Sequence, residues 1–531
     1  MSAPGEPAAA PRPAPSVRAV ALLLGASVAL SRVVGYVREI TLANQLGVGS
    51  SSDAYNAAFT IPDVLNYLLA GGALTVAFVP FYTRVRRERG DAAAQQLFET
   101  VLGTTAALVV VATCVLFALA DELVRVAFSG FDAPTRALTA RLSRILLPAQ
   151  VFFVTGGIVR AVLMVEGRFA THAVAPVVYN LGIIAGGLAT GTPEGFAWGA
   201  LAGAVVGPFA LPVADLLRTH RVGLRIDLRS RDFRTYAWIA LPLMLGLSLT
   251  TVDEWYEKLF GQALAVGTVA VLGFARKLVQ APIAIVGQAI GVAALPTLTR
   301  LWSEGRTDEL ERVLSGALRA AIGLGALSAA FVFAFAAPVV TVLYQHGAFS
   351  AEAAARTGRV LAVMSFAIVG WIAQQVAVRA FYAREEMWRA MALGTAIVVA
   401  VVPLYVFAGG AYGAEGLAAA GAVAMVVNAV ATLAWARARF GGPRLGPLAR
   451  SLARSAVVAA AAAAAGRAAG GAAVGALGAE GRAAAIAELV AGGAAFAAAA
   501  AIGLAAVGDA ETRATAQRLA GRAARLARRR R

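Results

Sequence analysis

Long apolar runs separated by short polar segments recur along the whole 531-residue chain. A helix needs about 20 predominantly apolar residues to cross a bilayer, and most of these runs reach that length. They predict fourteen transmembrane helices, near residues 17–44, 52–84, 97–120, 136–165, 172–190, 194–219, 233–261, 267–302, 312–343, 354–383, 387–409, 413–437, 450–468 and 483–508. The segment 450–468 is the least distinct, because it is largely alanine. The pattern predicts an all-α polytopic membrane protein.

The composition agrees with a bilayer as the solvent of this chain. Hydrophobic residues make up 59% of the sequence and charged residues 15%, whereas a soluble domain carries about 25% charged residues. The single cysteine, Cys114, excludes an intramolecular disulfide framework, and the three widely spaced histidines form no HExxH-type metal motif. These counts exclude an ordinary soluble protein and a cysteine-based zinc site.

The net charge of +17 comes mainly from arginines in alternate loops. The loops after the second, sixth and twelfth predicted spans and the C-terminal tail are rich in arginine, at residues 84–89, 218–234, 437–454 and 513–531. Glu194 is the one charged residue in the loops after the first, fifth and seventh spans. By the positive-inside rule, this alternation predicts that both termini are cytoplasmic, and it explains the basic excess without a nucleic-acid partner.

The two ends of the chain have distinct compositions. Residues 1–16 are rich in proline and alanine, which predicts a disordered cytoplasmic tail. The first apolar stretch is about 28 residues long and contains Arg32 and Arg38, so it is too long and too charged for a cleaved signal peptide. Residues 511–531 form a basic, amphipathic cytoplasmic tail that we expect to lie against the anionic inner leaflet.

A weak internal repeat relates the two halves of the chain. The second predicted span ends in AFVPFYTR (77–84) and the eighth in AALPTLTR (293–300), six helices further on. Either two helices end alike by chance, or the halves form a parallel repeat about an axis along the membrane normal, as in many transporters. The repeat predicts an N-terminal lobe at 17–220, a C-terminal lobe at 221–440 and a helix pair at 441–510.

Charged residues inside the predicted spans are costly to insert, so each should face a partner or a cavity. Those in the first, second, seventh and eighth spans include Arg32, Arg38, Glu39, Asp53, Asp63, Asp253, Glu254, Glu257, Lys258, Arg276 and Lys277. One interpretation is internal ion pairing, such as Arg38 with Asp53 or Arg276 with Glu254. In the other, the basic residues of the first and eighth spans meet at a cavity and hold an anionic phosphate group. The acids would then balance these charges or bind a coupling cation.

Several motifs resemble those of the MurJ/MviN family of lipid II flippases, in the multidrug/oligosaccharidyl-lipid/polysaccharide exporter superfamily. They include SRVVGYVRE (31–39), DAYNAAFTIPDVL (53–65), GGALTVAFVPFYT (71–83), ARKLVQAP (275–282) and AFYAREE (380–386). The resemblance implies fourteen helices in two six-helix lobes plus a C-terminal pair. It also implies transport of an undecaprenyl-diphosphate-linked peptidoglycan precursor across the bacterial inner membrane.

The same resemblance implies roles for particular residues. Arg32, Arg38 and Glu39 match charged positions on the family's first helix, and Asp53 matches the acidic start of the second. Lys277 falls where the family usually has an essential arginine on the eighth helix.

The sequence departs from the family at several positions. The better-known members carry an arginine pair and then a glutamate in the second helix, where this chain has Asn66, Tyr67 and Gly71. The KTP that usually precedes the eleventh helix is WRA at 388–390. These departures leave the exact headgroup and the coupling ion open.

These inferences combine into one expected mechanism. Arg32, Arg38, Arg276 and Lys277 would bind the diphosphate in an inward-open cavity, and rocking of the two lobes would expose it to the periplasm. The family implies that the polyprenyl tail lies near the last two spans. We expect a monomer with no cofactor, driven by the membrane potential or by a monovalent cation.

The sequence leaves two alternative functions open and argues against two others. The chain could export another polyprenyl-diphosphate-linked glycan, or it could be a transport-inactive paralogue. A cation-coupled drug antiporter would need acids and aromatics in its cavity, and the basic motif of the first span argues against it. A membrane enzyme such as a polyprenyl-phosphate transferase would need a DDxxD or HxxxxD motif, and neither is present.

Overall fold

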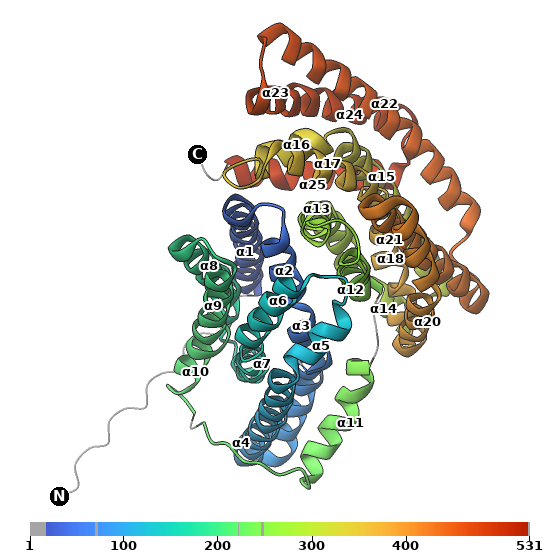
Figure 1. Cartoon of the computed structure of the whole chain (residues 1–531). Coiled ribbons are helices and arrows are strands. Elements are labelled where there is room, and N and C mark those ends of the chain that lie inside the picture. The colour runs from blue at the N-terminus through green and yellow to red at the C-terminus, as the bar shows by residue number, and fades with distance from the viewer. Residues whose placement is uncertain (1–16, 70–72, 221, 246–248, 529–531) are drawn as a thin grey trace, which may run out of the picture. The chain divides into compact units, whose positions relative to one another are not determined.

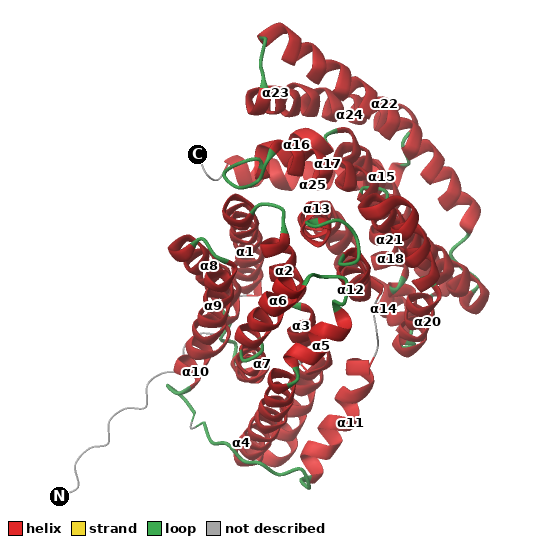
Figure 2. Ribbon diagram, in the orientation of Figure 1, coloured by secondary structure: helices red, strands yellow, loops and turns green. Residues whose placement is uncertain are grey.

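The computed structural model describes residues 17–528 apart from 70–72, 221 and 246–248. Every regular element within these ranges is a helix, as Figure 2 shows. The predicted disordered tail at 1–16, Gly71 and the last three residues lie outside the described residues. The all-α class predicted from the apolar runs is confirmed.

Nine helical stretches in the described part of the chain are long and apolar enough to cross a membrane, and ten if one bent pair forms a single span. Two of them are much longer than the roughly 20 residues that one crossing requires. Phe78–Ala118 has 41 residues with a break at Gly90, and Met387–Phe440 has 54 with a break at Gly413. Both glycines have positive φ, which a helix interior does not adopt. The exact count of fourteen spans is not confirmed and stays a prediction.

The chain forms two compact units, each built from segments that are not contiguous in sequence. Unit 1 comprises 1–41, 61–119 and 143–244, and unit 2 comprises 42–60, 120–142 and 245–531. Segments 42–60 and 120–142, which lie in the first half of the sequence, thus belong with the C-terminal half.

Unit 1 contains most of α1 and seven further α-helices, coloured from blue to light green in Figure 1. Its helices are α1 (Val17–Leu46), α3 (Thr60–Leu69), α4 (Ala73–Ala118), α7 (Ala149–Val165), α8 (Ala170–Thr190), α9 (Pro193–Ala204), α10 (Leu211–Leu216) and α11 (Arg231–Leu245). A π-helical turn at Val205–Ala210 joins α9 to α10.

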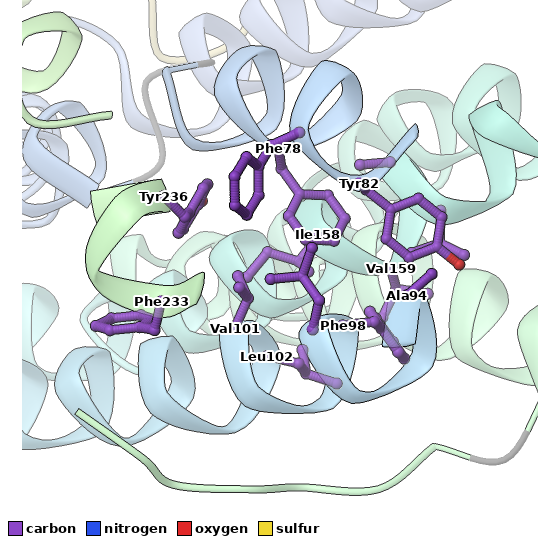
Figure 3. Packing of buried hydrophobic residues seen from close by; sticks show 14 of the residues in the cluster. Phe78, Tyr82, Ala94, Phe98, Val101, Leu102, Ile158, Val159, Phe233 and Tyr236 are labelled. Atoms are coloured by element: carbon purple, nitrogen blue, oxygen red, sulfur yellow. The ribbon is translucent and has the colours of Figure 1, made fainter. Parts of the chain in front are cut away.

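Packing in unit 1 has two components. Aromatic and branched side chains from α4, α7 and α11 form a buried cluster around Phe78, Ile158 and Tyr236 (Figure 3). The Phe78 and Tyr236 rings meet edge to face with centroids 5.9 Å apart. Helices α8 and α9 instead pack backbone to backbone. A Cβ at Gly186 would lie 2.2 Å from the carbonyl oxygen of Gly195, so only small residues allow this approach.

Unit 2 holds the remaining helices. They are α2 (Ser50–Ala58), α5 (Ala120–Ala127), α6 (Ala133–Leu146), α12 (Leu249–Gly261), α13 (Thr268–Pro282), α14 (Gln288–Ser303), α15 (Thr307–Ala334), α16 (Ala336–Tyr344), α17 (Ala351–Met364), α18 (Ala367–Ala377), α19 (Arg379–Tyr382), α20 (Met387–Ala400), α21 (Val402–Phe440), α22 (Leu445–Leu477), α23 (Gly481–Ala487), α24 (Gly493–Val507) and α25 (Ala510–Arg528). Short π-helical segments at Ile283–Gly287 and Glu488–Gly492 continue α13 and α23.

Long helices form the framework of unit 2. Helix α15 packs against both α18 and α22, and α22 lies beside α24 (Figure 1). Glycines again allow close contact, because a Cβ at Gly370 of α18 would lie 2.9 Å from the backbone of Met425 in α21. Helix α12 packs against α21, and α13 packs against α17. Helices α12 and α13 carry most of the charged residues predicted inside the C-terminal lobe.

Candidate functional site

The charged residues of the first helix lie in unit 1. There, the Arg38 side chain contacts one acidic and one amide side chain. Its guanidinium forms an ion pair with Glu39 and donates a 2.9 Å hydrogen bond from Nη1 to Oδ1 of Asn180 on α8. The amide of Asn180 donates in turn to the carbonyl of Pro176 at 2.8 Å, which turns its oxygen toward Arg38. The Arg38 side chain is 24% exposed. It is therefore oriented by its neighbours but still accessible.

Arg32 lies six residues before Arg38 on α1 and is half-buried. It interacts electrostatically with Tyr36, one turn further along the helix. Arg38 and Asp63 both interact electrostatically with Tyr179, next to Asn180. Unit 1 thus groups several polar side chains around the half of α1 that carries the predicted phosphate-binding arginines.

Asp53 has a different environment in unit 2. Its two carboxylate oxygens accept hydrogen bonds from the backbone N–H groups of Gly267 at 2.6 Å and Ala270 at 2.7 Å. These N–H groups belong to the first turn of α13 and the residue before it, where helical donors have no partner in the helix itself. The buried carboxylate, 3% exposed, caps α13 and complements its dipole.

Neighbouring loops of unit 2 meet near this cap. The backbone N–H of Ala348, in the loop after α16, donates to the carbonyl of Asn44 at 2.9 Å. The N–H of Gly130 donates to the side chain of Gln262 at 2.6 Å. The last turn of α1 is therefore bonded to the loop after α16, and the loop after α5 is bonded to the residue that follows α12.

The acids of α12 form a buried ion cluster with Arg276 of α13. Nε of Arg276 donates to Glu257 at 2.7 Å, and the same guanidinium pairs with Asp253. The hydroxyl of Tyr405 on α21 donates to Asp253. The Arg276 guanidinium also lies over the Trp371 ring, 5.7 Å from its centroid. Only 4% of the Arg276 side chain is exposed, so these contacts replace its hydration shell.

Lys277 follows Arg276 on α13 and therefore points about 100° away around the helix. Its side chain is half-buried, unlike that of Arg276. Glu254 pairs with Lys258 at 3.2 Å and interacts electrostatically with Lys277 and Arg276. Three acids and three bases therefore share this region of unit 2, and their formal charges cancel.

The structure brings together some of the predicted residues and leaves others in separate groups. Arg276 forms ion pairs with Asp253 and Glu257, as the ion-pair interpretation predicts. The partner predicted from the sequence was Glu254, which is a different acid of the same helix. Arg38 pairs with Glu39 within unit 1, and Asp53 bonds to backbone groups of unit 2. The convergence of first-span and eighth-span bases on one phosphate stays a prediction.

Sequence reasoning missed four partners in these clusters. Asn180 and Tyr405 each lie in an otherwise apolar predicted span, so an isolated polar side chain was the available signal. The backbone donors at Gly267 and Ala270 had no such signal, because any residue can supply an N–H group.

Two proteins of known sequence are similar to this chain over most of its length. A protein of Rhizobium tropici named "Probable lipid II flippase MurJ" is 29% identical over 424 residues, covering 77% of this chain and 79% of that protein. The "Lipid II flippase MurJ" of Burkholderia cenocepacia is 27% identical over 392 residues, covering 71% of this chain and 76% of that protein.

Solved structures show the same fold. A lipid II flippase MurJ in an inward closed conformation matches with a TM-score of 0.75, covering 91% of this chain and 99% of that chain at 16% identity. An inward-facing multidrug transporter of the MATE family, in the MOP superfamily, matches with a TM-score of 0.64 over 80% of this chain and 98% of that chain at 20% identity.

A family model extends the match along most of the sequence. The model described as "Lipid II flippase MurJ" covers residues 42–475, which include Asp53, the α12–α13 ion cluster and most of α22. The resemblance inferred from the sequence motifs is thereby confirmed, and the chain belongs to the lipid II flippase MurJ family.

Proposed function

We propose that this protein flips lipid II from the cytoplasmic to the periplasmic leaflet of the bacterial plasma membrane, for peptidoglycan synthesis. The family match over residues 42–475 carries the proposal. The activity is transport by alternating access and makes or breaks no covalent bond in the substrate. The chain is a multi-span membrane protein, and the arginine-rich loops support cytoplasmic termini. We propose that it acts as a monomer.

Arg38, Arg32 and Lys277 are the residues that we propose bind the diphosphate. A guanidinium presents a planar fork of donors that fits phosphate oxygens, and an ammonium adds a compact charge. The hydrogen bond from Arg38 to Asn180 supports the role of Arg38, because it limits the freedom of a side chain that remains partly exposed. Arg276 was also predicted as a phosphate ligand. We now propose that it positions α12 against α13, because its guanidinium is occupied by two carboxylates.

The membrane potential is sufficient as the driving force in this proposal. Moving one negative charge outward along an inside-negative potential releases about 2.3 kcal/mol per 100 mV. The acids of α12, the predicted site for a coupling cation, already have Arg276 and Lys258 as tethered cations. We therefore propose that no sodium ion or proton at Asp253, Glu254 or Glu257 is needed, and that the protein uses no cofactor.

Complementation of a conditional flippase-depleted bacterial strain tests the proposal. The wild-type chain should restore growth, and Arg38→Ala should abolish rescue at equal membrane expression. Arg225→Ala is the matched control, because its side chain is 58% exposed and its bond to Glu99 runs through the backbone N–H. Failure of the well-expressed wild-type chain would refute lipid II transport, and equal rescue by both variants would refute the role of Arg38.

Export of another polyprenyl-diphosphate-linked glycan is the second candidate. Asn66, half-buried on α3, stands where better-known family members carry a charged residue, and this supports a different sugar headgroup. Flipping assays in liposomes with lipid II and with a second undecaprenyl-diphosphate glycan would separate the candidates. Transport of the second glycan alone would favour this alternative, and transport of neither would favour an inactive paralogue.

A further inference from the structure

Two adjoining cavities lie beside the start of α15 in unit 2, away from the charged clusters of α12 and α13. The first has a volume of about 520 Å³ and is an open pocket lined by α14, α15 and α25. The second, of about 600 Å³, lies between α15, α25 and the start of α22. Arg312 and Glu511 line both cavities, so together they form one site of the size that small-molecule ligands occupy.

The C-terminal helix α25 completes this site by docking on α15. Thr512 is fully buried, and its hydroxyl donates to the carbonyl of Arg319 at 3.2 Å. Gly323 makes room for it, since a Cβ there would lie 2.6 Å from the Thr512 side chain. Glu511 also pairs with Arg319 at 3.5 Å. The first turn of α25 is therefore a packed part of unit 2.

One wall of the first cavity is apolar. Helices α14 and α15 line it with small and branched aliphatic side chains and one glycine, at Ala289, Ile290, Ala293, Ala294, Val313, Gly316, Ala317 and Ala320. This wall belongs to two helices that are candidate membrane spans. A hydrocarbon chain packed against this wall would bury apolar surface away from water.

The polar lining of the site is rich in arginine. Arg312, Arg319, Arg444 and Arg518 line the two cavities, with Asp308, Glu311 and Glu511 as the acidic residues. Within the described residues, no carboxylate lies within salt-bridge distance of Arg312, Arg444 or Arg518. The buried Nε–H of Arg319 also has no acceptor in the described part of the chain. Several guanidinium donors are therefore available to a ligand.

We propose that this site binds an anionic glycerophospholipid, with its phosphate on Arg312 and Arg518 and an acyl chain along the alanine-rich wall. An apolar wall beside arginine donors at the end of a membrane span suits an amphiphile with a phosphate headgroup. The chain's own C-terminal residues do not suit it, because 519–531 contain six more arginines and no acid. This inference goes beyond the proposed flippase activity and does not depend on it.

The test uses the full-length protein in nanodiscs of phosphatidylcholine doped with phosphatidylglycerol, followed by native mass spectrometry. Wild type should retain phosphatidylglycerol over phosphatidylcholine. The double variant Arg312→Gln/Arg518→Gln should lose about tenfold or more of this preference, as expected for two lost charge-assisted hydrogen bonds. Ala293→Phe, which fills the wall and keeps all charges, should also reduce retention. Thermal unfolding of each variant confirms that it is folded.

Arg300→Gln/Arg513→Gln is the matched control, because it removes two arginines that do not line the cavities. An equal loss of preference in this control would overturn the proposal by showing general surface attraction. Unchanged preference in the folded cavity variants would also overturn it. Displacement of the lipid by glycerol phosphate at equal concentration would show a site for soluble phosphate and not for a lipid.

Discussion

Replacing Arg276 separates a structural role from a substrate-binding role. In Arg276→Met the guanidinium is lost, while Asp253 and Glu257 remain 3% exposed and close together. Breaking a buried ion pair by removing one partner costs about 3–5 kcal/mol, because an uncompensated charge stays in a medium of low dielectric constant. The loss of the contact with the Trp371 ring adds about 0.5–2 kcal/mol. We expect the free energy of unfolding to fall by about 4 kcal/mol or more.

The triple variant Arg276→Met/Asp253→Asn/Glu257→Gln should recover most of that loss. It removes all three charges and keeps similar volumes, so no uncompensated charge of this cluster stays buried. The side-chain amide that replaces the Asp253 carboxylate would still accept the hydrogen bond that Tyr405 donates in the wild-type protein. Unfolding in mixed detergent–SDS micelles measures the free energy, and complementation measures transport.

Two results would refute this reasoning about Arg276. If the single variant unfolds at the wild-type free energy, then the cluster does not stabilise unit 2. If the triple variant is as stable as wild type but fails to rescue growth while membrane expression is normal, then Arg276 contacts substrate or the acids take part in coupling. Rescue by the triple variant would support both the positioning role and transport without a cation at this cluster.

Three further predictions follow from single contacts. Asp53→Ala should lower the free energy of unfolding by about 0.5–2 kcal/mol, because it uncaps α13; Asp91→Ala, at an exposed position of α4 next to the break at Gly90, serves as control, and equal effects would contradict the cap. Asn180→Leu should impair rescue in the wild-type background and cause little further loss in an Arg38→Lys background, which keeps the charge but not the guanidinium; additive losses would show that Asn180 does not act through Arg38. Gly186→Ala should cost about 1–3 kcal/mol by forcing α8 from α9, measured by detergent–SDS unfolding against Gly471→Ala, which meets nothing within 4 Å; similar unfolding of both would refute close packing.

The fold class and the family were accessible from the sequence because they depend on features that repeat over many residues. Apolar runs of membrane-spanning length recur throughout, and no local error in their boundaries changes the all-helical class. The count of spans was less accessible. Helices α4 and α21 continue in the structure through the breaks at Gly90 and Gly413, so length and hydropathy alone merge neighbouring spans there.

The residues of the candidate site could be predicted from the sequence, but the groups that they contact could not. A charged residue inside an apolar run needs compensation, so Arg38, Asp53 and Arg276 could be selected from their positions. From the sequence alone, Asp53 is a possible partner for Arg38. The structure instead shows the Asp53 carboxylate on backbone N–H groups more than 200 residues later, at Gly267 and Ala270.

Local sequence is sufficient to identify this chain as a helical membrane protein of the lipid II flippase MurJ family, because apolar runs and short motifs can be recognised without knowing which helices are neighbours. Only the tertiary structure decided that Arg276 is held by Asp253 and Glu257, and that Thr512 docks α25 on α15. The physical reason is that the energy of a buried charge or hydroxyl depends on the atoms around it. Packing between helices distant in sequence chooses those atoms.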